Sequence, residues 1–431
     1  MRWLSSLALA AAAALSPALA SAQTKIEFFF PVPVDGKLAK ELQRLTKVYN
    51  DSQKDVAVTP VYAGNYDDTK LKAQAAAKAG KPPAVALMSA NYLLDLKLSG
   101  DLLSLEPMLQ ADGTTRTKFL DDFWPALHAN ATVDGELYGV PYQNSTPLLY
   151  YNKEHFKEVG LDPEKPPQTW AELVDAAKKL TKEGRWGFQI AGGYDYVGWL
   201  MQTLVMTNGG RFYNEDYGGE IYYDTASTQG AAQFVEDLVF RHKVSQPGVL
   251  DGGAVSTNFL AGKLSMMLLS TGSLSFVRDN MKMAYGVGFV PRNVRNAVPI
   301  GGGSLVMFKG INEEQKQAGW KFIKWLTSAE TLGGWSRFTG YFAPRKSSYE
   351  LPEMKEFIAK NPDAKVALDQ LPFAKPWIAT YQTVAVRKAL DDTMQAVMNG
   401  KLKAPQAVKD AQKNADALLK PYVEQTALKL P

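Results

Sequence analysis

Short apolar runs and amphipathic stretches alternate in the first part of this chain, and this alternation limits the fold more than any other feature. Strands are predicted at 25–30, 56–61 and 83–88, and helices at 37–49 and 71–79. Strands that alternate with helices through short turns are typical of a parallel sheet covered by helices. Ligands of such sheets bind beyond the carboxyl ends of the strands. We therefore expect an α/β fold with doubly wound sheets and a site near these ends.

The first 22 residues have the three parts of an export signal. Arg2 is basic, residues 4–15 are apolar, and Ala20-Ser21-Ala22 fits a cleavage site. We therefore predict a signal peptide at 1–22. No later stretch reaches the roughly 18 apolar residues that a membrane span requires. Because the sequence has no cysteine, disulfides and a lipid-modified cysteine are excluded, and we predict a periplasmic protein.

Charge and histidine content exclude several classes of function. The net charge of +4 is too small to indicate binding to nucleic acid or to an anionic membrane. His128, His155 and His242 lie far apart in the sequence, so neither a zinc site nor a histidine-dependent catalytic triad is expected. We expect no metal and no cofactor.

Three stretches interrupt the alternation and are predicted to cross between two domains. They are 137–152, 285–299 and 339–341. Roughly 400 residues after the signal exceed one ordinary core, and repeated crossings favour two discontinuous lobes around a cleft that closes by a hinge. The predicted N-terminal lobe comprises 23–143 and 289–338, and the predicted C-terminal lobe comprises 144–288 and 339–431.

The stretch 264–280 combines a predicted buried strand, a turn of Ser270, Thr271, Gly272 and Ser273, and the start of a helix. The first N–H groups of a helix lack intrahelical partners and favour anions. Ser270 and Thr271 offer hydroxyl donors as well. Ordinary helix capping by serine and threonine explains the same residues, so both interpretations stay open from this stretch alone.

Nine segments, in this order and spacing, resemble one family. They are 62–66, 145–153 (STPLLYYNK), 160–173 (GLDPEKPPQTWAEL), 270–274 (STGSL), 285–288 (YGVG), 300–305, 339–341, 399–401 and 405–407. Together they resemble the periplasmic glycerol-3-phosphate-binding proteins of ABC importers, within extracellular solute-binding protein family 1, over essentially the whole chain after the signal. The resemblance implies a two-lobed, maltose-binding-like fold that delivers its ligand to an inner-membrane permease and ATPase complex.

The resemblance also implies site residues. Ligand contacts fall on Tyr66 and Ser145, and the phosphate contacts on Ser270, Gly302, Tyr341 and Arg387. A second group of candidates is Ser89, Ala90, Tyr196 and Thr271. Ala90 stands where the family has an acidic residue directed toward the glycerol hydroxyls, and Tyr196 falls where the family has a tryptophan. The phosphate end therefore matches the family, whereas the glycerol end differs.

The residues themselves are compatible with a phosphate site. A phosphate needs a delocalised cation, hydroxyl donors and no carboxylate nearby, and Arg387 offers a bidentate fork. Other interpretations stay open: Arg387 pairing with Asp391 on a solvated helix face, Tyr66 and Tyr196 as packing aromatics, and 301–303 as a flexible turn.

Two other functions match the residues less well. A neutral sugar would use aromatic rings such as Tyr194, Tyr196, Trp199 and Trp377, although the missing acid at Ala90 disfavours a hydroxyl-rich ligand. An exported glycosidase or phosphodiesterase would need facing carboxylates, a metal cluster or an activated nucleophile, and the acids at 67–68 and 121–122 are merely adjacent. We expect a monomeric binding protein, not an enzyme, that captures sn-glycerol-3-phosphate or a glycerophosphodiester by cleft closure.

Overall fold

The larger of the two main sheets carries the predicted alternation. The computed structural model describes residues 23–31, 35–194 and 196–426, so the predicted signal peptide lies outside the described residues. The strand order is β12-β11-β3-β1-β2, and β6 pairs with β11. The strands are β1 (Thr24–Phe30), β2 (Val56–Tyr62), β3 (Val85–Ser89), β6 (Gly139–Ser145), β11 (Val298–Val306) and β12 (Ala374–Pro376). β1 pairs in parallel with β2 and β3 as predicted, whereas β11 pairs antiparallel with β3 and β6.

Helices cover this sheet with the apolar faces that their sequences predict. The helices are α1 (Asp35–Ser52), α2 (Tyr66–Lys78), α3 (Leu93–Leu98), α4 (Glu106–Ala111), α5 (Arg116–Leu120), α12 (Glu313–Leu326), α13 (Ala329–Thr339) and α14 (Pro352–Lys360). Leu42 of α1 and Phe322 of α12 share a core with Phe28 of β1. α2 lies against β1 and β3, where Ala73 and Met88 are fully buried together. A small hairpin, β4 (Thr132–Val133) and β5 (Glu136–Leu137), contacts α3 through β4.

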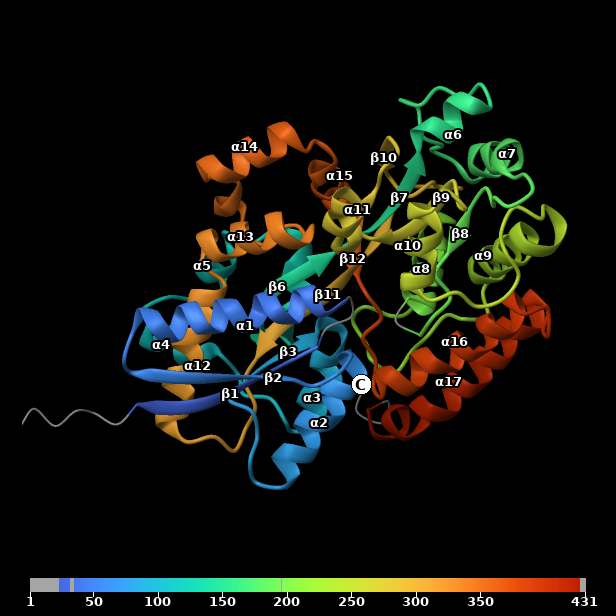
Figure 1. Cartoon of the computed structure of the whole chain (residues 1–431). Coiled ribbons are helices and arrows are strands. Elements are labelled where there is room, and N and C mark those ends of the chain that lie inside the picture. Colours follow the sequence, from blue (N-terminus) through green and yellow to red (C-terminus); the bar gives the residue numbers. More distant parts are fainter. Residues whose placement is uncertain (1–22, 32–34, 195, 427–431) are drawn as a thin grey trace, which may run out of the picture.

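The second sheet has its own core. It runs in the order β10-β7-β9-β8, formed by β7 (Pro147–Asn152), β8 (Gln189–Ile190), β9 (Met266–Ser270) and β10 (Tyr285–Gly288). Its helices are α6 (Lys153–Glu158), α7 (Trp170–Leu180), α8 (Val197–Thr207), α9 (Ala226–Glu236), α10 (Gly252–Leu260), α11 (Leu274–Asn280), α15 (Asp363–Gln370), α16 (Thr383–Met398) and α17 (Ala404–Thr426). α16 and α17 lie side by side (Figure 1) and share this core with α8.

These two units are the two lobes of the fold. We call the six-stranded sheet with its helices the first lobe, and the four-stranded sheet with its helices the second lobe. The chain passes from one to the other between β6 and β7, and again between β10 and β11. Tyr341, Ala343 and Met354, which follow α13, pack in the core of the first lobe.

The glycine run at 301–303 is not a turn. It lies within β11, where the pairing with β6 shifts register between Gly303 and Ser304. Gly302 has φ +87°, and a Cβ there would lie 1.9 Å from the carbonyl oxygen of Gln143. The interpretation of 301–303 as a flexible turn is therefore wrong, because glycine here lets two strands approach each other closely.

Candidate ligand-binding site

All six residues that the resemblance placed at the ligand line one cavity of about 60 Å³. Residues from both lobes meet there. They are Tyr66 at the start of α2, Ser145 at the end of β6, Ser270 at the end of β9, Gly302 in β11, Tyr341 after α13 and Arg387 in α16. Ser145 and Ser270 end their strands, in keeping with the expectation that a ligand binds where the strands end. The other lining residues are Asp67, Tyr92, Tyr196, Trp199, Gly301 and Trp377.

Aromatic rings form much of the wall of this cavity, and glycines make room for them. A Cβ on Gly272 would lie 2.6 Å from the ring of Tyr341, and a Cβ on Gly301 would lie 2.8 Å from the ring of Trp199. The indole N–H groups of Trp199 and Trp377 are buried and have no hydrogen-bond partner among the described residues. An indole N–H can only donate, so both tryptophans can supply neutral donors to a ligand oxygen.

Arg387 is the cation of the cavity among the described residues that line it. Its side chain is 5% exposed, and Nη2 donates to Oδ2 of Asp67 across 2.7 Å. Nη1 donates to the hydroxyl of Tyr92 across 3.3 Å, and that hydroxyl in turn donates to Asp67. The guanidinium also lies 5.2 Å from the ring centroid of Trp377. Because α2 belongs to the first lobe and α16 to the second, this ion pair connects the two lobes.

A second carboxylate lies behind the arginine. Oδ2 of Asp391 is 3.5 Å from Nε of Arg387, and Asp391 is 1% exposed. Neither oxygen of Asp391 has a hydrogen-bond partner in the described part of the chain. Burial raises the pKa of Asp391 to about 8, although the nearby charge of Arg387 acts to lower it. Burial also acts to lower the pKa of Arg387, but Tyr92 and the two carboxylates raise it, so the arginine stays charged.

Two expectations about Arg387 are wrong. Its pair with Asp391 does not lie on a solvated helix face, because both side chains are buried. A carboxylate also lies close to the cavity cation, since Asp67 contacts the guanidinium directly. Sequence reasoning missed Asp67 and Tyr92. Their signal was indirect: Asp67 follows Tyr66, and Tyr92 lies one turn beyond the end of β3.

In the second group of candidates, Tyr196 lines the cavity and the other three do not. Ser89 and Ala90 follow β3 and are buried, and the Ser89 hydroxyl donates to Oδ1 of Asn91 across 2.6 Å. Thr271 Oγ1 donates to the carbonyl oxygen of Thr146 across 2.7 Å. Thr271 therefore connects the turn after β9 to the crossing between β6 and β7.

Two backbone N–H groups of the turn at 270–273 donate to other groups of the protein. The N–H of Gly272 donates to Ser270 Oγ, and the N–H of Thr271 donates to the carbonyl oxygen of Thr146. The helix that follows, α11, has 7 residues and begins after a short 3₁₀ turn. The capping interpretation therefore describes this turn, and Ser270 is its residue that lines the cavity.

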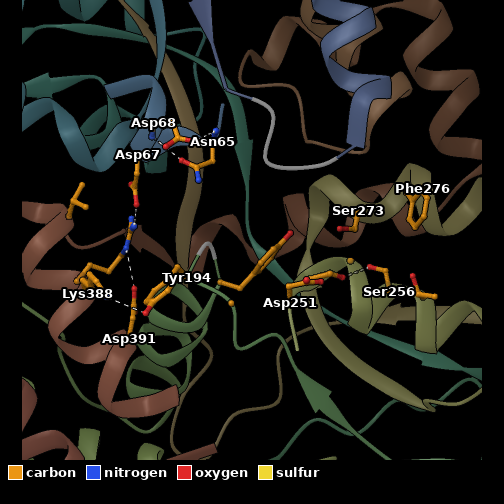
Figure 2. Close-up of a pocket in the computed structure, with 17 residues that line it drawn as sticks. Asn65, Asp67, Asp68, Tyr194, Asp251, Ser256, Ser273, Phe276, Lys388 and Asp391 are labelled. Carbon is orange, nitrogen blue, oxygen red and sulfur yellow. Dashed lines mark hydrogen bonds and ion pairs between the residues drawn. The ribbon is translucent and has the colours of Figure 1, made fainter. Parts of the chain in front are cut away.

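A larger groove of about 770 Å³ adjoins the cavity and shares Asp67, Tyr196 and Arg387 with it. Figure 2 shows Asp67, Lys388, Tyr194 and Asp391 gathered on one side, and Asp251, Ser256 and Phe276 on the other. Nζ of Lys388 donates to Oδ1 of Asp392 across 2.6 Å, and it also donates to the hydroxyl oxygen of Tyr194.

Among the described residues, no group of histidine and acidic side chains is arranged to hold a metal ion. No helix in this part of the chain is long and apolar enough to cross a membrane.

A two-lobed fold with a cavity between its sheets is typical of proteins that bind a solute. The family of bacterial extracellular solute-binding proteins matches residues 44–366, and the chain belongs to this family. Membership of this family confirms the prediction of a binding protein rather than an enzyme. Because the family is extracellular, the protein acts outside the cytoplasm.

Comparison with individual proteins supports the resemblance drawn from the sequence. The chain is 29% identical to the sn-glycerol-3-phosphate-binding periplasmic protein UgpB of Pectobacterium atrosepticum over 435 residues, which cover 96% of this chain and 95% of that protein. UgpB from Mycobacterium tuberculosis, solved in complex with glycerophosphocholine, superposes with a TM-score of 0.83 at 25% identity, over 93% of this chain and all of that one. The predicted resemblance and the two-lobed fold are thereby confirmed.

A maltose-binding relative shares the same fold. Maltose-bound MalE3 of T. maritima superposes with a TM-score of 0.80 at 24% identity, over 92% of this chain and 100% of that one. At this level of identity the similarity shows the fold, and the ligand of this chain must be argued from its own residues.

Proposed function

We propose that this protein is the periplasmic substrate-binding component of an ABC importer and captures sn-glycerol-3-phosphate or a glycerophosphodiester. The observation that carries the proposal is the convergence of Tyr66, Ser145, Ser270, Gly302, Tyr341 and Arg387 on one cavity. They come from six separate segments of the chain, and the fold brings them to the same cavity. The UgpB relatives are named for binding sn-glycerol-3-phosphate, and the solved M. tuberculosis protein holds glycerophosphocholine.

In this proposal Arg387 supplies charge to the phosphate, and hydroxyl groups supply the other donors. Arg387 has five N–H donors, of which Nη1 and Nη2 each use one on Tyr92 and Asp67. Ser270 and Tyr341 donate to further phosphate oxygens, while Tyr66 and Ser145 contact the glycerol end.

The two lobes close around the ligand, and the closed form docks on an inner-membrane permease with its ATPase. We propose a monomer that binds no nucleic acid. The lobe division at 23–143 with 289–338 and 144–288 with 339–431 stays a prediction. The packing of Tyr341 and Met354 in the first lobe favours a boundary later than residue 338, and the chain returns to the sheet of the first lobe at β12.

A neutral sugar is the second candidate ligand, because Tyr196, Trp199 and Trp377 line the cavity. Aromatic faces are suited to the apolar faces of sugar rings. A sugar would leave the charge of Arg387 without a role in ligand binding, although Arg387 lines the same cavity.

Thermal unfolding with a ligand panel tests the function. Glycerophosphocholine or sn-glycerol-3-phosphate at 100 times its dissociation constant should stabilise the protein by about 2.7 kcal/mol. Maltose and glycerol-2-phosphate serve as controls for the sugar and for the position of the phosphate. A shift with maltose and none with any phosphorylated glycerol compound would contradict the proposal.

A further inference from the structure

We propose that capture of an anionic ligand at Arg387 is coupled to the uptake of a proton by Asp391, so that binding weakens as the solution becomes more alkaline. The proton comes from the solvent and converts the carboxylate of Asp391 to a neutral carboxylic acid. This inference rests on the proposed function, because it requires a ligand that brings negative charge to the cavity.

Two carboxylates of the protein share one buried cation. Nη2 of Arg387 lies 2.7 Å from Oδ2 of Asp67, and Nε lies 3.5 Å from Oδ2 of Asp391. Figure 2 shows both carboxylates with the contacts that join them to the arginine. Arg387 is the cation among the described residues that line the small cavity. With Asp391 ionised, these three side chains therefore carry a net negative charge before any ligand arrives.

The two carboxylates differ in how their charge is stabilised. Asp67 accepts hydrogen bonds from Nη2 of Arg387 and from the hydroxyl group of Tyr92. Neither oxygen of Asp391 has a hydrogen-bond partner in the described part of the chain, although Asp391 is 1% exposed. Hydrogen bonds favour the charged form of a carboxylate, whereas burial favours the neutral form. Asp391 is therefore the carboxylate that takes up a proton more readily.

The groups packed around Asp391 supply no second cation. The charges that act on it are those of Arg387 and Asp392 on α16 and of Asp67 on α2. Tyr223 also faces Asp391, but burial raises the pKa of its hydroxyl group well above the usual value, so this tyrosine stays neutral. α8 has no titratable side chain, and the buried residues of α17 are all apolar. Among the described residues, only the Arg387 guanidinium therefore acts to keep Asp391 ionised.

A ligand anion at Arg387 adds a further negative charge beside Asp391. Burial raises the pKa of Asp391 to about 8, while the charge of Arg387 acts to lower it. Because a nearby like charge raises the pKa of a carboxylate, the ligand should raise this pKa further. Above about pH 7, part of the free protein has Asp391 ionised, and this part takes up a proton on binding. At about pH 6, Asp391 is protonated with and without ligand, so no uptake is expected.

Calorimetry with the methyl ester of sn-glycerol-3-phosphate counts these protons, because its phosphodiester keeps one charge throughout this range. Titrations at about pH 8 in HEPES and in Tris, whose ionisation enthalpies differ, should give an uptake of about half a proton for each ligand bound. The uptake should vanish at about pH 6, and the affinity should fall on the order of fivefold to tenfold between about pH 7 and 9. Since the second pKa of a phosphate monoester is about 6, sn-glycerol-3-phosphate is fully ionised at about pH 8 and serves there as a second probe.

Variants test whether Asp391 is the group that takes up the proton. Asp391→Asn keeps the shape of the side chain and removes the titrating group, so the uptake should be lost and the affinity should stay nearly constant between about pH 7 and 9. Asp51→Asn is the control, because Asp51 forms an exposed pair with Lys47 on α1, and it should keep the wild-type uptake. If Asp391→Asn fails to fold, the proton count of the wild type at about pH 8 and at about pH 6 still decides.

Each contrary result has a distinct meaning. Binding of either phosphate compound at about pH 8 without proton uptake refutes the inference and leaves the proposed function standing. Uptake that persists in folded Asp391→Asn refutes the role of Asp391. Binding of maltose with no binding of either phosphate compound refutes the proposed function itself.

Discussion

Arg387 shows at the scale of single residues what the sequence could and could not predict. The resemblance identified it as the phosphate contact, and it lines the cavity together with the other five predicted residues. Its burial was not predictable from the spacing to Asp391, because an i,i+4 pair is the same in sequence on a solvated and on a buried helix face. The face is buried because α8 packs on α16 at Gly198, where a Cβ would lie 2.5 Å from Oδ1 of Asp391.

Asp391 makes the stability of the protein depend on pH. Its pKa is about 8 in the folded state and about 3.9 in an unfolded chain. Between these values the folded state holds a proton that the unfolded state has lost, so the free energy of unfolding falls as pH rises. The charged groups that face Asp391 are Arg387 and Asp392 from α16 and Asp67 from α2.

The free energy of unfolding should fall less for Asp391→Asn than for the wild type as the pH rises from about 5 to 8. We expect the two decreases to differ by on the order of 1–3 kcal/mol. Urea unfolding at a series of pH values measures this. Asp392→Asn is the matched control, because Asp392 forms an exposed pair with Lys388 on the same helix and should keep the wild-type slope. Parallel curves for the wild type and Asp391→Asn would show that Asp391 is ionised in the folded protein.

At the scale of elements, local patterns were predicted better than packing. The strands predicted at 25–30 and 56–61 are confirmed as Thr24–Phe30 and Val56–Tyr62, because each pattern depends on neighbouring residues. The helix predicted at 71–79 begins five residues earlier, as Tyr66–Lys78. Gly302 lies inside a strand because Gln143 of β6 approaches it from a distant part of the chain, and no local pattern reports such an approach.

Gly302→Ala should strongly destabilise the protein. The added Cβ would lie 1.9 Å from the carbonyl oxygen of Gln143, at φ +87°, so the substitution combines a steric clash with backbone strain and should cost more than about 1–3 kcal/mol. Gly334→Ala is the control, because Gly334 lies in α13 and a Cβ added there would meet nothing within 4 Å. Alanine at that position should stabilise the protein by about 0.5–1 kcal/mol. Equal midpoints of urea unfolding for the two variants would contradict this account of β11.

For the whole molecule, the two lobes are what create the site. The predicted ligand contacts come from both lobes, and the ion pair of Arg387 with Asp67 connects one lobe to the other. The α/β class was predictable from the alternation of strands and helices, and the two-lobed form from the resemblance and the chain crossings. The charge balance at the cavity was not predictable, because Asp67 and Arg387 lie 320 positions apart in the sequence.

The central claim is that the cavity at Arg387 binds the phosphate of a glycerol compound, and calorimetric titration with glycerophosphocholine tests it most directly. Arg387→Lys should weaken binding on the order of tenfold or more, since lysine lacks the planar fork that contacts two oxygens at once. Arg345→Lys is the matched control: Arg345 also pairs with an aspartate, Asp122, and lies over the ring of Phe123, but it does not line the cavity. Wild-type affinity in Arg345→Lys with weakened binding in Arg387→Lys is the predicted result. Wild-type affinity in Arg387→Lys would contradict the account.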